Sequence, residues 1–187
     1  MISRYPDASS FIRKFIGADE FINNGDRYCL WLKDTSPSML KRYPEIVARL
    51  DATRNFRLSS DRPATRELAS TPSQFAFVSH EESSYIIVPS VSSERRQFIP
   101  VGFMSSDVIA SNLCLIIPNA SLFHFGVLTS TMHNAWMRTV CGRLKSDYRY
   151  SAGIMQQLPW PENPSEKQKQ AIETAAQAVL DARLAIP

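Results

Sequence analysis

The feature that most constrains this fold is a series of short β-rich runs in the middle of the chain. They cover residues 75–78, 85–88, 98–101 and 113–117, and Ser, Pro, Asn and Gly residues separate them. Short runs of β-branched and aromatic residues between turn formers are typical of strands. Helical patterns stand before and after this region. The sequence therefore predicts an α+β fold, in which a small mixed or antiparallel sheet is flanked by helices.

The flanking elements are predicted from caps and turn residues. Before the sheet we expect a short helix over residues 9–16, a strand over 27–32, a helix that opens at 36–38 and resumes over 45–56, and another helix capped by Asp61. After the sheet, an apolar stripe predicts one helix over residues 120–140 that ends at Gly142. A further strand is expected over residues 151–160.

The C-terminal helix has the clearest signal in the chain. Asn163 is the predicted N-cap, Pro164 takes the first helical position, and Glu166 stands three residues after the cap. The narrow apolar face of this helix must be covered by its own domain or by another domain. That face consists of Ile172, Ala175, Ala176, Val179 and Leu180. We therefore divide the chain into a domain at residues 1–160 and a helical tail at residues 161–187.

Composition excludes several classes of protein. Hydrophobic residues make up 44% of the 187 residues, so the chain can bury a core and disorder is excluded as its main state. Cys29, Cys114 and Cys141 lie far apart without a CxxC spacing, which excludes a disulfide scaffold and a classical zinc site. No apolar run reaches the length of a membrane span, and polar residues follow Met1. We expect no signal peptide and a cytoplasmic location.

Catalytic motifs are largely absent. The sequence contains no GxGxxG, GxxxxGK[ST], GxSxG or HExxH pattern. His124 and His133 fall on one predicted helix at a spacing unsuited to a metal site, and we interpret them as packing residues. Cys141 could act as the nucleophile of a small hydrolase only if a histidine came close in space, and a core position is the simpler interpretation. We therefore expect no catalytic residue and no metal site.

The formal net charge is only +3, but basic residues gather in two segments. Four arginines at residues 54–66 lie among Asn, Ser and Thr, which are side chains that contact a sugar–phosphate backbone. Residues 138–149 interleave four basic residues with tyrosines, a pattern that suits an anionic polymer with stackable groups. A solvated helical face and a loop anchored by buried tyrosines are the structural alternatives. The basic residues are Arg54, Arg57, Arg62, Arg66, Arg138, Arg143, Lys145 and Arg149.

A third segment lies between two predicted strands. Residues 91–100 place Ser93, Glu94, Arg95 and Arg96 in a short connection. The planar guanidinium of arginine suits phosphate oxygens or the O6 and N7 atoms of guanine. The structural alternative is a strand end in which Glu94 pairs with a neighbouring arginine. Because neighbouring strand residues point to opposite faces, we expect one arginine to face a nucleic acid and the other to brace the loop.

Longer strings across nearly the whole chain carry a family resemblance. They are Phe15–Asn23 with Arg27–Leu32, VSSERR at 91–96, HNAWMR at 133–138, GRLKSDYRYS at 142–151, and the Leu158–Pro161 segment. On these strings the chain resembles the target recognition domains of MmeI-like enzymes, although that family usually has Phe where Leu158 stands. The segment over residues 158–183 also resembles part of a type I restriction specificity subunit.

The resemblance carries functional expectations. MmeI-like enzymes join a nuclease, an adenine-specific DNA methyltransferase and a recognition domain in one polypeptide. The resemblance implies a bacterial recognition domain that docks into the major groove of double-stranded DNA, with the methyltransferase domain of the same polypeptide as a second partner. S-adenosylmethionine and Mg²⁺ are implied for the whole enzyme, but no S-adenosylmethionine loop, Asn-Pro-Pro-Tyr motif or nuclease metal site occurs in these residues. We expect a fragment without a cofactor or catalysis of its own.

The main hypothesis is thus a sequence-specific DNA recognition module. Basic side chains at 54–66 and 138–149 are expected to neutralise phosphates, and side chains at 92–97 are expected to read base edges. Two alternatives stay open. One is a protein-interaction module that docks through its C-terminal helix, and the other is a small hydrolase that uses Cys141.

Overall fold

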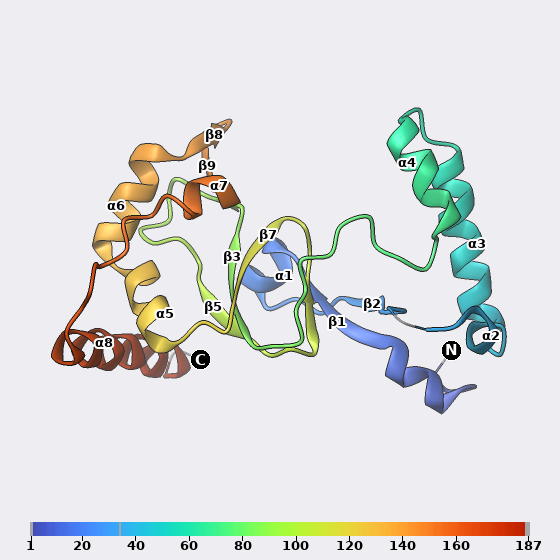
Figure 1. Cartoon of the computed structure of the whole chain (residues 1–187), viewed down its shortest axis with the longest axis horizontal. Helices are drawn as coiled ribbons and strands as arrows, with labels where there is room; N and C mark the ends of the chain where they lie inside the picture. The colour runs from blue at the N-terminus through green and yellow to red at the C-terminus, as the bar shows by residue number, and fades with distance from the viewer. Residues whose placement is uncertain (1, 34, 186–187) are drawn as a thin grey trace. The chain divides into compact units, whose positions relative to one another are not determined.

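The computed structural model describes residues 2–33 and 35–185, which form two compact units (Figure 1). Unit 1 contains the residues up to 14 together with residues 28–78, and unit 2 contains residues 15–27 and the residues from 79 onward. Strand β1 (Ile12–Ile16) begins in unit 1 and ends in unit 2. Small sheets of antiparallel strands are flanked by helices, so the fold is α+β. This confirms the predicted fold class.

Unit 1 is mainly helical. After the 3-10 helix η1 (Pro6–Phe11), the start of β1 pairs antiparallel with β2 (Tyr28–Leu30). Helices α2 (Pro37–Leu40), α3 (Pro44–Leu58) and α4 (Pro63–Glu67) each begin with proline, whose fixed φ favours the first helical turn. The short 3-10 helix η2 (Leu68–Ser70) follows α4. The buried core of unit 1 consists of Ala8, Phe11, Leu32, Leu40, Tyr43 and Ile46.

Unit 2 is built around β3 (Tyr85–Pro89), which lies between β5 (Gly102–Met104) and β7 (Cys114–Pro118) and pairs antiparallel with both. All five residues of β3 are buried, because both faces of the strand are covered. Ile86 and Val88 belong to the larger core of the unit, whereas Tyr85 and Ile87 belong to a second core. This division follows from the alternation of side chains along a strand. Helix α1 (Ala18–Asn23) and strand β6 (Val108–Ala110) complete this part.

The rest of unit 2 carries the second sheet and most of its helices. Helices α5 (Leu122–Thr129) and α6 (Thr131–Val140) lead into the hairpin of β8 (Gly142–Leu144) and β9 (Asp147–Arg149). Strand β4 (Val91–Ser92) pairs antiparallel with the edge of β9 opposite β8, so β9 is the central strand in the order β4–β9–β8. Helix α7 (Ala152–Met155) follows the hairpin, and α8 (Glu166–Leu184) ends the described chain.

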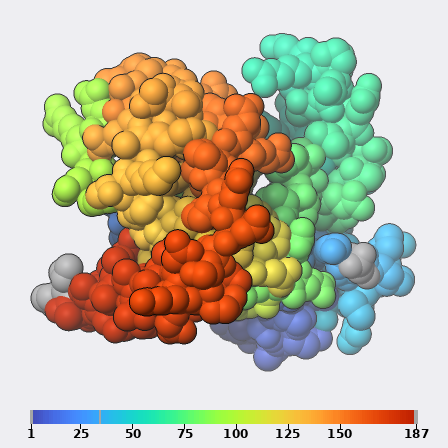
Figure 2. All heavy atoms as spheres, turned by 60° about the vertical axis from the view of Figure 1, so that its left-hand side comes forward, coloured from blue at the N-terminus to red at the C-terminus, as the bar shows by residue number. Residues whose placement is uncertain are grey.

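Helix α8 packs on α5 within unit 2, as we expected for a helix with one apolar stripe. Figure 2 shows the red atoms of α8 against the yellow segment that carries α5, and Figure 1 shows the same neighbours. Gly126 of α5 faces Ile172 and Ala176 of α8, and Ala176 is only 1% exposed. At the far end of α8, the Arg183 guanidinium donates a 2.7 Å hydrogen bond to the carbonyl of Val101.

Three predicted strands are wrong. Residues 75–78 are irregular, and Phe77 is 66% exposed, so no sheet covers this apolar run. Ile99 and Val101 are buried, but the Ile99 N–H donates to the side chain of Asn134 at 2.9 Å instead of a strand. Residues 151–160 contain α7 followed by an irregular segment. A tertiary hydrogen bond thus replaces strand pairing at Ile99, whereas local helical bonds, such as that from the Met155 N–H to the Ser151 carbonyl, replace it after residue 151.

The predicted helices also differ in detail. Residues 12–16 form a strand because residues 12–14 pair with β2, which overrides the local helical pattern. The helix predicted over 120–140 breaks at Ser130, whose backbone is extended and whose side chain caps α6 by accepting from the His133 N–H. Gly142 opens β8 and does not end a helix.

Two predicted helix caps are shifted along the chain. Ser165 caps the C-terminal helix instead of Asn163, which takes a left-handed conformation with φ at 45°. Arg62 occupies the cap position of α4 instead of Asp61. Among the described residues, no helix combines the length and apolarity required to cross a membrane.

Candidate nucleic-acid interface

The structure sorts the predicted DNA-binding residues into two groups. Four lie on or beside α3 and α4 in unit 1, namely Arg54, Arg57, Arg62 and Arg66. The other seven, predicted from separate segments, lie on or beside the β4–β9–β8 sheet of unit 2. We call these seven the arginine cluster. It consists of Ser93, Arg95, Arg96, Arg138, Arg143, Lys145 and Arg149.

The β8–β9 hairpin presents three basic residues of the cluster, Arg143, Lys145 and Arg149, and buries the tyrosines. Leu144 pairs with Asp147, so Lys145 and Ser146 form a two-residue turn, with Lys145 in a left-handed conformation at φ 58°. Tyr148 and Tyr150 are 8% and 2% exposed, whereas Arg149 between them is exposed. Side chains alternate between faces in a strand, so the tyrosines anchor the hairpin in the core while the cations face solvent. The two interpretations of residues 138–149 are therefore compatible, because a loop anchored by buried tyrosines also exposes basic side chains.

The connection after β4 is a turn and not a regular strand. The Arg96 N–H donates to the carbonyl of Ser93 at 3.1 Å, and both Arg95 and Arg96 are exposed. Glu94 pairs with Arg143 of the hairpin at 3.6 Å, so the structural alternative, in which Glu94 pairs with Arg95 or Arg96, is wrong. Strand alternation does not apply to a turn, and it therefore does not force the two arginines onto opposite faces.

Three members of the arginine cluster have internal partners. The Ser93 hydroxyl accepts from the Arg95 N–H at 3.3 Å. The Arg138 guanidinium donates to the carbonyls of Arg96 and Gln97, the second at 2.8 Å. The Arg143 guanidinium lies 3.9 Å from the centre of the Tyr148 ring and donates to the carbonyl of Ser146 at 2.7 Å. Within residues 2–33 and 35–185, the structure shows no hydrogen bond or ion pair for four other side chains of the cluster. These are Arg95, Arg96, Lys145 and Arg149.

His133 is a buried packing residue that fixes the end of the hairpin. Its Nδ1 lies 2.6 Å from the carbonyl of Leu128, and its Nε2 lies 3.0 Å from the hydroxyl of Tyr150. A carbonyl can only accept, so Nδ1 carries the proton, and Nε2 of the neutral ring accepts from the tyrosine. Burial lowers the pKa of His133 and thereby favours this neutral form. The ring thus ties the chain after β9 to α6, as we predicted for a structural histidine.

The environment of Cys141 does not suit a nucleophile. Burial raises the pKa of the Cys141 thiol to about 11, so the thiol stays protonated near neutral pH. Both ring nitrogens of His133 are already engaged, and Nδ1 of His124 lies 3.1 Å from the Ser121 nitrogen at the start of α5. The Cys141 thiol is therefore not activated as a nucleophile in this geometry, which disfavours the hydrolase hypothesis.

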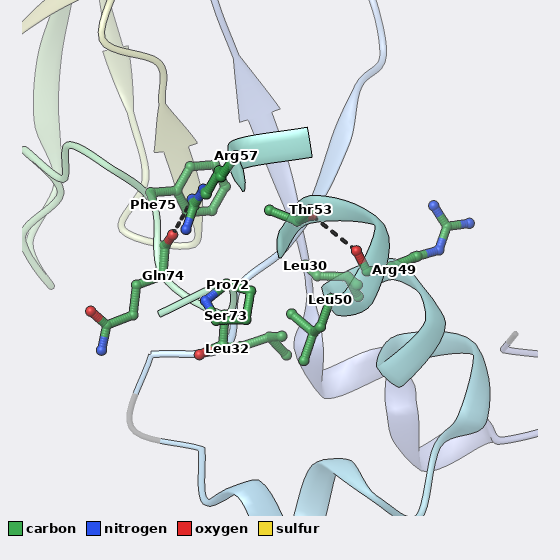
Figure 3. A pocket seen from close by; sticks show the side chains of 10 residues that line it. All are labelled: Leu30, Leu32, Arg49, Leu50, Thr53, Arg57, Pro72, Ser73, Gln74 and Phe75. Carbon is green, nitrogen blue, oxygen red and sulfur yellow. Dashed lines mark hydrogen bonds between the residues drawn. The ribbon is translucent and has the colours of Figure 1, made fainter. Parts of the chain in front are cut away.

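The arginines of unit 1 differ in how they are held. The Arg57 guanidinium donates to the carbonyls of Leu68, Thr71 and Gln74 at 2.7, 2.9 and 2.7 Å, and Figure 3 shows it reaching toward Gln74 across a small pocket. Arg66 donates to the carbonyl of Ser60 at 2.8 Å. The exposed Arg54 and Arg62 side chains form no hydrogen bond or ion pair in the part of the chain that the structure describes. Arg57 therefore braces the loop after α4, and a phosphate contact by any of these arginines stays a prediction.

Sequence reasoning missed two residues that organise the arginine cluster. Tyr148 is the common contact of Arg138 and Arg143, whose guanidinium carbons lie 5.6 and 3.9 Å from the ring centre. Asn134 holds the segment after the 93–97 turn by accepting from the Ile99 N–H. The alternation of tyrosine and arginine at 148–150 was the available signal for Tyr148. No local pattern links Asn134 to Ile99, which lies 35 residues away.

Comparisons with known proteins place the chain among relatives of known class. A family model described as MmeI, target recognition domain, matches residues 1–162. DNA methyltransferase A of Bacillus subtilis (strain 168) is 45% identical over 184 residues, which is 97% of this chain and 21% of that protein. A solved structure of the type IIL restriction-modification enzyme MmeI in complex with DNA is 47% identical, with a TM-score of 0.95, and the match covers 100% of this chain and 25% of that one. The chain thus spans only a quarter or less of the length of these relatives.

Proposed function

The chain belongs to the MmeI target recognition domain family, and on that premise we propose that it is the sequence-specific, double-stranded DNA recognition module of a larger restriction–modification DNA methyltransferase. The observation that carries the proposal is the arginine cluster. Basic residues from three separate segments meet on one small sheet of unit 2, and four of them are exposed and have no internal partner among the described residues. Such a surface attracts the DNA backbone and places side chains at the base edges.

The two groups of arginines divide the work in this proposal. The exposed Arg54 and Arg62 neutralise phosphates and set the register, while the turn at residues 93–97 reads base edges together with the hairpin tip. The buried tyrosines and His133 keep the hairpin in one conformation. Binding energy is therefore not lost to ordering the hairpin on contact.

Catalysis belongs to other parts of the parent enzyme in this proposal. The relatives are four to five times longer than the matched region, since it covers 21% and 25% of their lengths. Among the described residues, no group of three or more His, Cys, Asp or Glu side chains could hold a metal ion. We assign S-adenosylmethionine and Mg²⁺ to the methyltransferase and nuclease parts of the parent, in the bacterial cytoplasm.

An apolar groove on unit 2 fits the methyltransferase domain as a second partner. The groove has a volume of about 570 Å³ and is walled by Trp136 of α6 and by the segment around Trp160. Met132 on its rim is 72% exposed, and Glu162 is its one charged lining residue. Exposed apolar surface of this kind marks a protein contact, and the carboxylate disfavours DNA but suits a basic residue beside apolar anchors. The alternative of docking through α8 is less favoured, because Ile172 and Ala176 of its apolar face already pack against Gly126 of α5, and only Ala175 and Val179 of that face are exposed.

The proposal is tested by selection from a duplex library. The chain is incubated with double-stranded DNA that contains a randomised segment, and the bound duplexes are sequenced. We expect one short sequence to be enriched, and the affinity for it should fall steeply with salt, with a slope of roughly −0.9 per neutralised phosphate. The double variant Arg54→Ala/Arg62→Ala should flatten that slope by up to about 2 and keep the selected sequence. Binding without salt dependence or sequence enrichment would contradict the proposal.

A further inference from the structure

Arg138 uses its guanidinium for contacts within the protein, unlike an exposed cation that is free to bind a phosphate. It lies on α6 and is partly buried, and its guanidinium donates to two consecutive backbone carbonyls, those of Arg96 and Gln97. Its guanidinium carbon also lies 5.6 Å from the centre of the Tyr148 ring. One side chain therefore touches the helix, the 93–97 turn and the hairpin.

The hairpin holds the same turn from the other side. Arg143 lies over the same Tyr148 ring at 3.9 Å and pairs with Glu94 at 3.6 Å. The Glu94 N–H donates to a carboxylate oxygen of Asp147 at 3.4 Å. The turn is thus fixed at Glu94 by the hairpin and at residues 96 and 97 by Arg138. Arg95 lies between these two attachments and Arg96 lies at the second one, and the side chains of both are exposed.

We infer that Arg138 is a positioning residue for base discrimination, which acts by holding the 93–97 turn in register with the β8–β9 hairpin. The inference rests on the proposed function, and it assigns Arg138 a role other than the phosphate contact expected from sequence. A bidentate contact to a base edge requires a fixed side-chain origin, and it contributes about 1–3 kcal/mol of discrimination against the wrong base. A turn without its Arg138 attachment offers the same charges from a wider range of positions.

The two roles of Arg138 give different results in binding experiments. A lost phosphate contact weakens all duplexes alike and flattens the salt slope by about 0.9. A lost positioning contact leaves the number of neutralised phosphates unchanged and reduces the preference for the correct sequence. The measured quantity is the ratio of the affinities for the selected duplex and a scrambled duplex, determined at several salt concentrations.

The test uses Arg138→Ala and Arg138→Met, which both remove the donors, while the methionine keeps an aliphatic stem beside Tyr148. We expect the discrimination ratio to fall about tenfold, within the range of one base contact, with an unchanged salt slope. Thr139→Ala, on an exposed position of the same helix, is the matched control and should keep the ratio. A flattened slope with an unchanged ratio would show that Arg138 binds a phosphate and would overturn the inference.

A measurement without DNA separates this inference from the proposed function. Hydrogen exchange of the backbone amides at residues 94–98 should be faster in both Arg138 variants than in the unsubstituted chain, since the turn loses one of its two attachments. Unchanged exchange in these amides would contradict the inference even if the chain selects a sequence. If the unsubstituted chain selects no sequence, the proposed function fails, and the discrimination role fails with it. Faster exchange would then still show that Arg138 holds the turn.

Discussion

The packing of α8 on α5 gives a sharp prediction at Gly126. A Cβ atom added to Gly126 would lie 2.6 Å from Cγ2 of Ile172, 3.1 Å from the Ile172 carbonyl oxygen and 3.3 Å from Cβ of Ala176. The side chain of Ile172 could turn away, but its carbonyl belongs to the backbone of α8. Gly126→Ala therefore requires the two helices to separate or to shift.

Two opposing effects set the size of the change. Alanine in place of glycine within a helix stabilises it by about 1 kcal/mol, whereas overpacking a tight contact costs about 1–3 kcal/mol. We expect Gly126→Ala to lower the free energy of unfolding of the chain by about 1 kcal/mol. Gly153 in α7 has no atom within 4 Å of an added Cβ and is the matched control. Gly153→Ala should be neutral or stabilising by up to about 1 kcal/mol.

Thermal unfolding measures the difference between the two variants. A gap of about 1–2 kcal/mol corresponds to a difference in Tm of about 2–8 °C for a chain of this size. Fluorescence of Trp136 and Trp160 reports on unit 2, where both glycines lie. In an Ile172→Ala background, Gly126→Ala should cost at least about 1 kcal/mol less, because the closest contact is gone. Equal stability of Gly126→Ala and Gly153→Ala, or an equal cost of Gly126→Ala in both backgrounds, would contradict a tight contact between α5 and α8.

Three further predictions follow from the environments of single residues. Cys141, with its pKa raised to about 11 from 9.0, should react with iodoacetamide at pH 8 about 100-fold more slowly than an unfolded cysteine peptide, and an equal rate would refute its burial. Burial lowers the pKa of His133, so stability that is present above the ordinary value of 6.5 should be lost as the pH falls below it. Denaturation at pH 7.5 and pH 5 should show that His133→Gln loses less unfolding free energy at the lower pH than the unsubstituted chain does. An equal loss would assign the pH dependence to other titrating groups. In the parent enzyme, Met132→Glu should loosen the contact between the recognition and methyltransferase domains and increase proteolysis between them, whereas Leu113→Glu, at a 62% exposed position outside the groove, should not.

Sequence patterns located most of the secondary structure but not its pairing. The β-rich runs at 85–88 and 113–117 are strands, because their composition fits a sheet buried on both faces or at its edge. The runs at 75–78 and 98–101 have a similar composition and are not strands. Their backbone groups find other partners, such as Asn134 for the Ile99 N–H, and composition carries no information about those partners.

Helix ends were predicted less well than helices. The C-terminal helix forms as its apolar stripe indicates, but Ser165 caps it, because Asn163 two residues earlier adopts a left-handed turn. Both residues are good caps by type, so the local sequence could not separate them. Only the path of the chain before the helix decides which residue takes the cap position.

Residue types and their spacing were enough to establish the class of the fold and to locate the cationic segments. Residue type and periodicity predict an α+β fold and structural histidines, and they offered a loop anchored by buried tyrosines as one interpretation of residues 138–149. The tertiary structure decided which cations bind the protein itself. Arg57, Arg138 and Arg143 have the same local signature as Arg62 and Arg96, but their guanidinium groups meet backbone carbonyls or a ring brought close by folding. Such carbonyls lie up to 42 residues away in the sequence. A local charge pattern therefore cannot distinguish an arginine that braces the fold from an arginine whose guanidinium is free for a ligand.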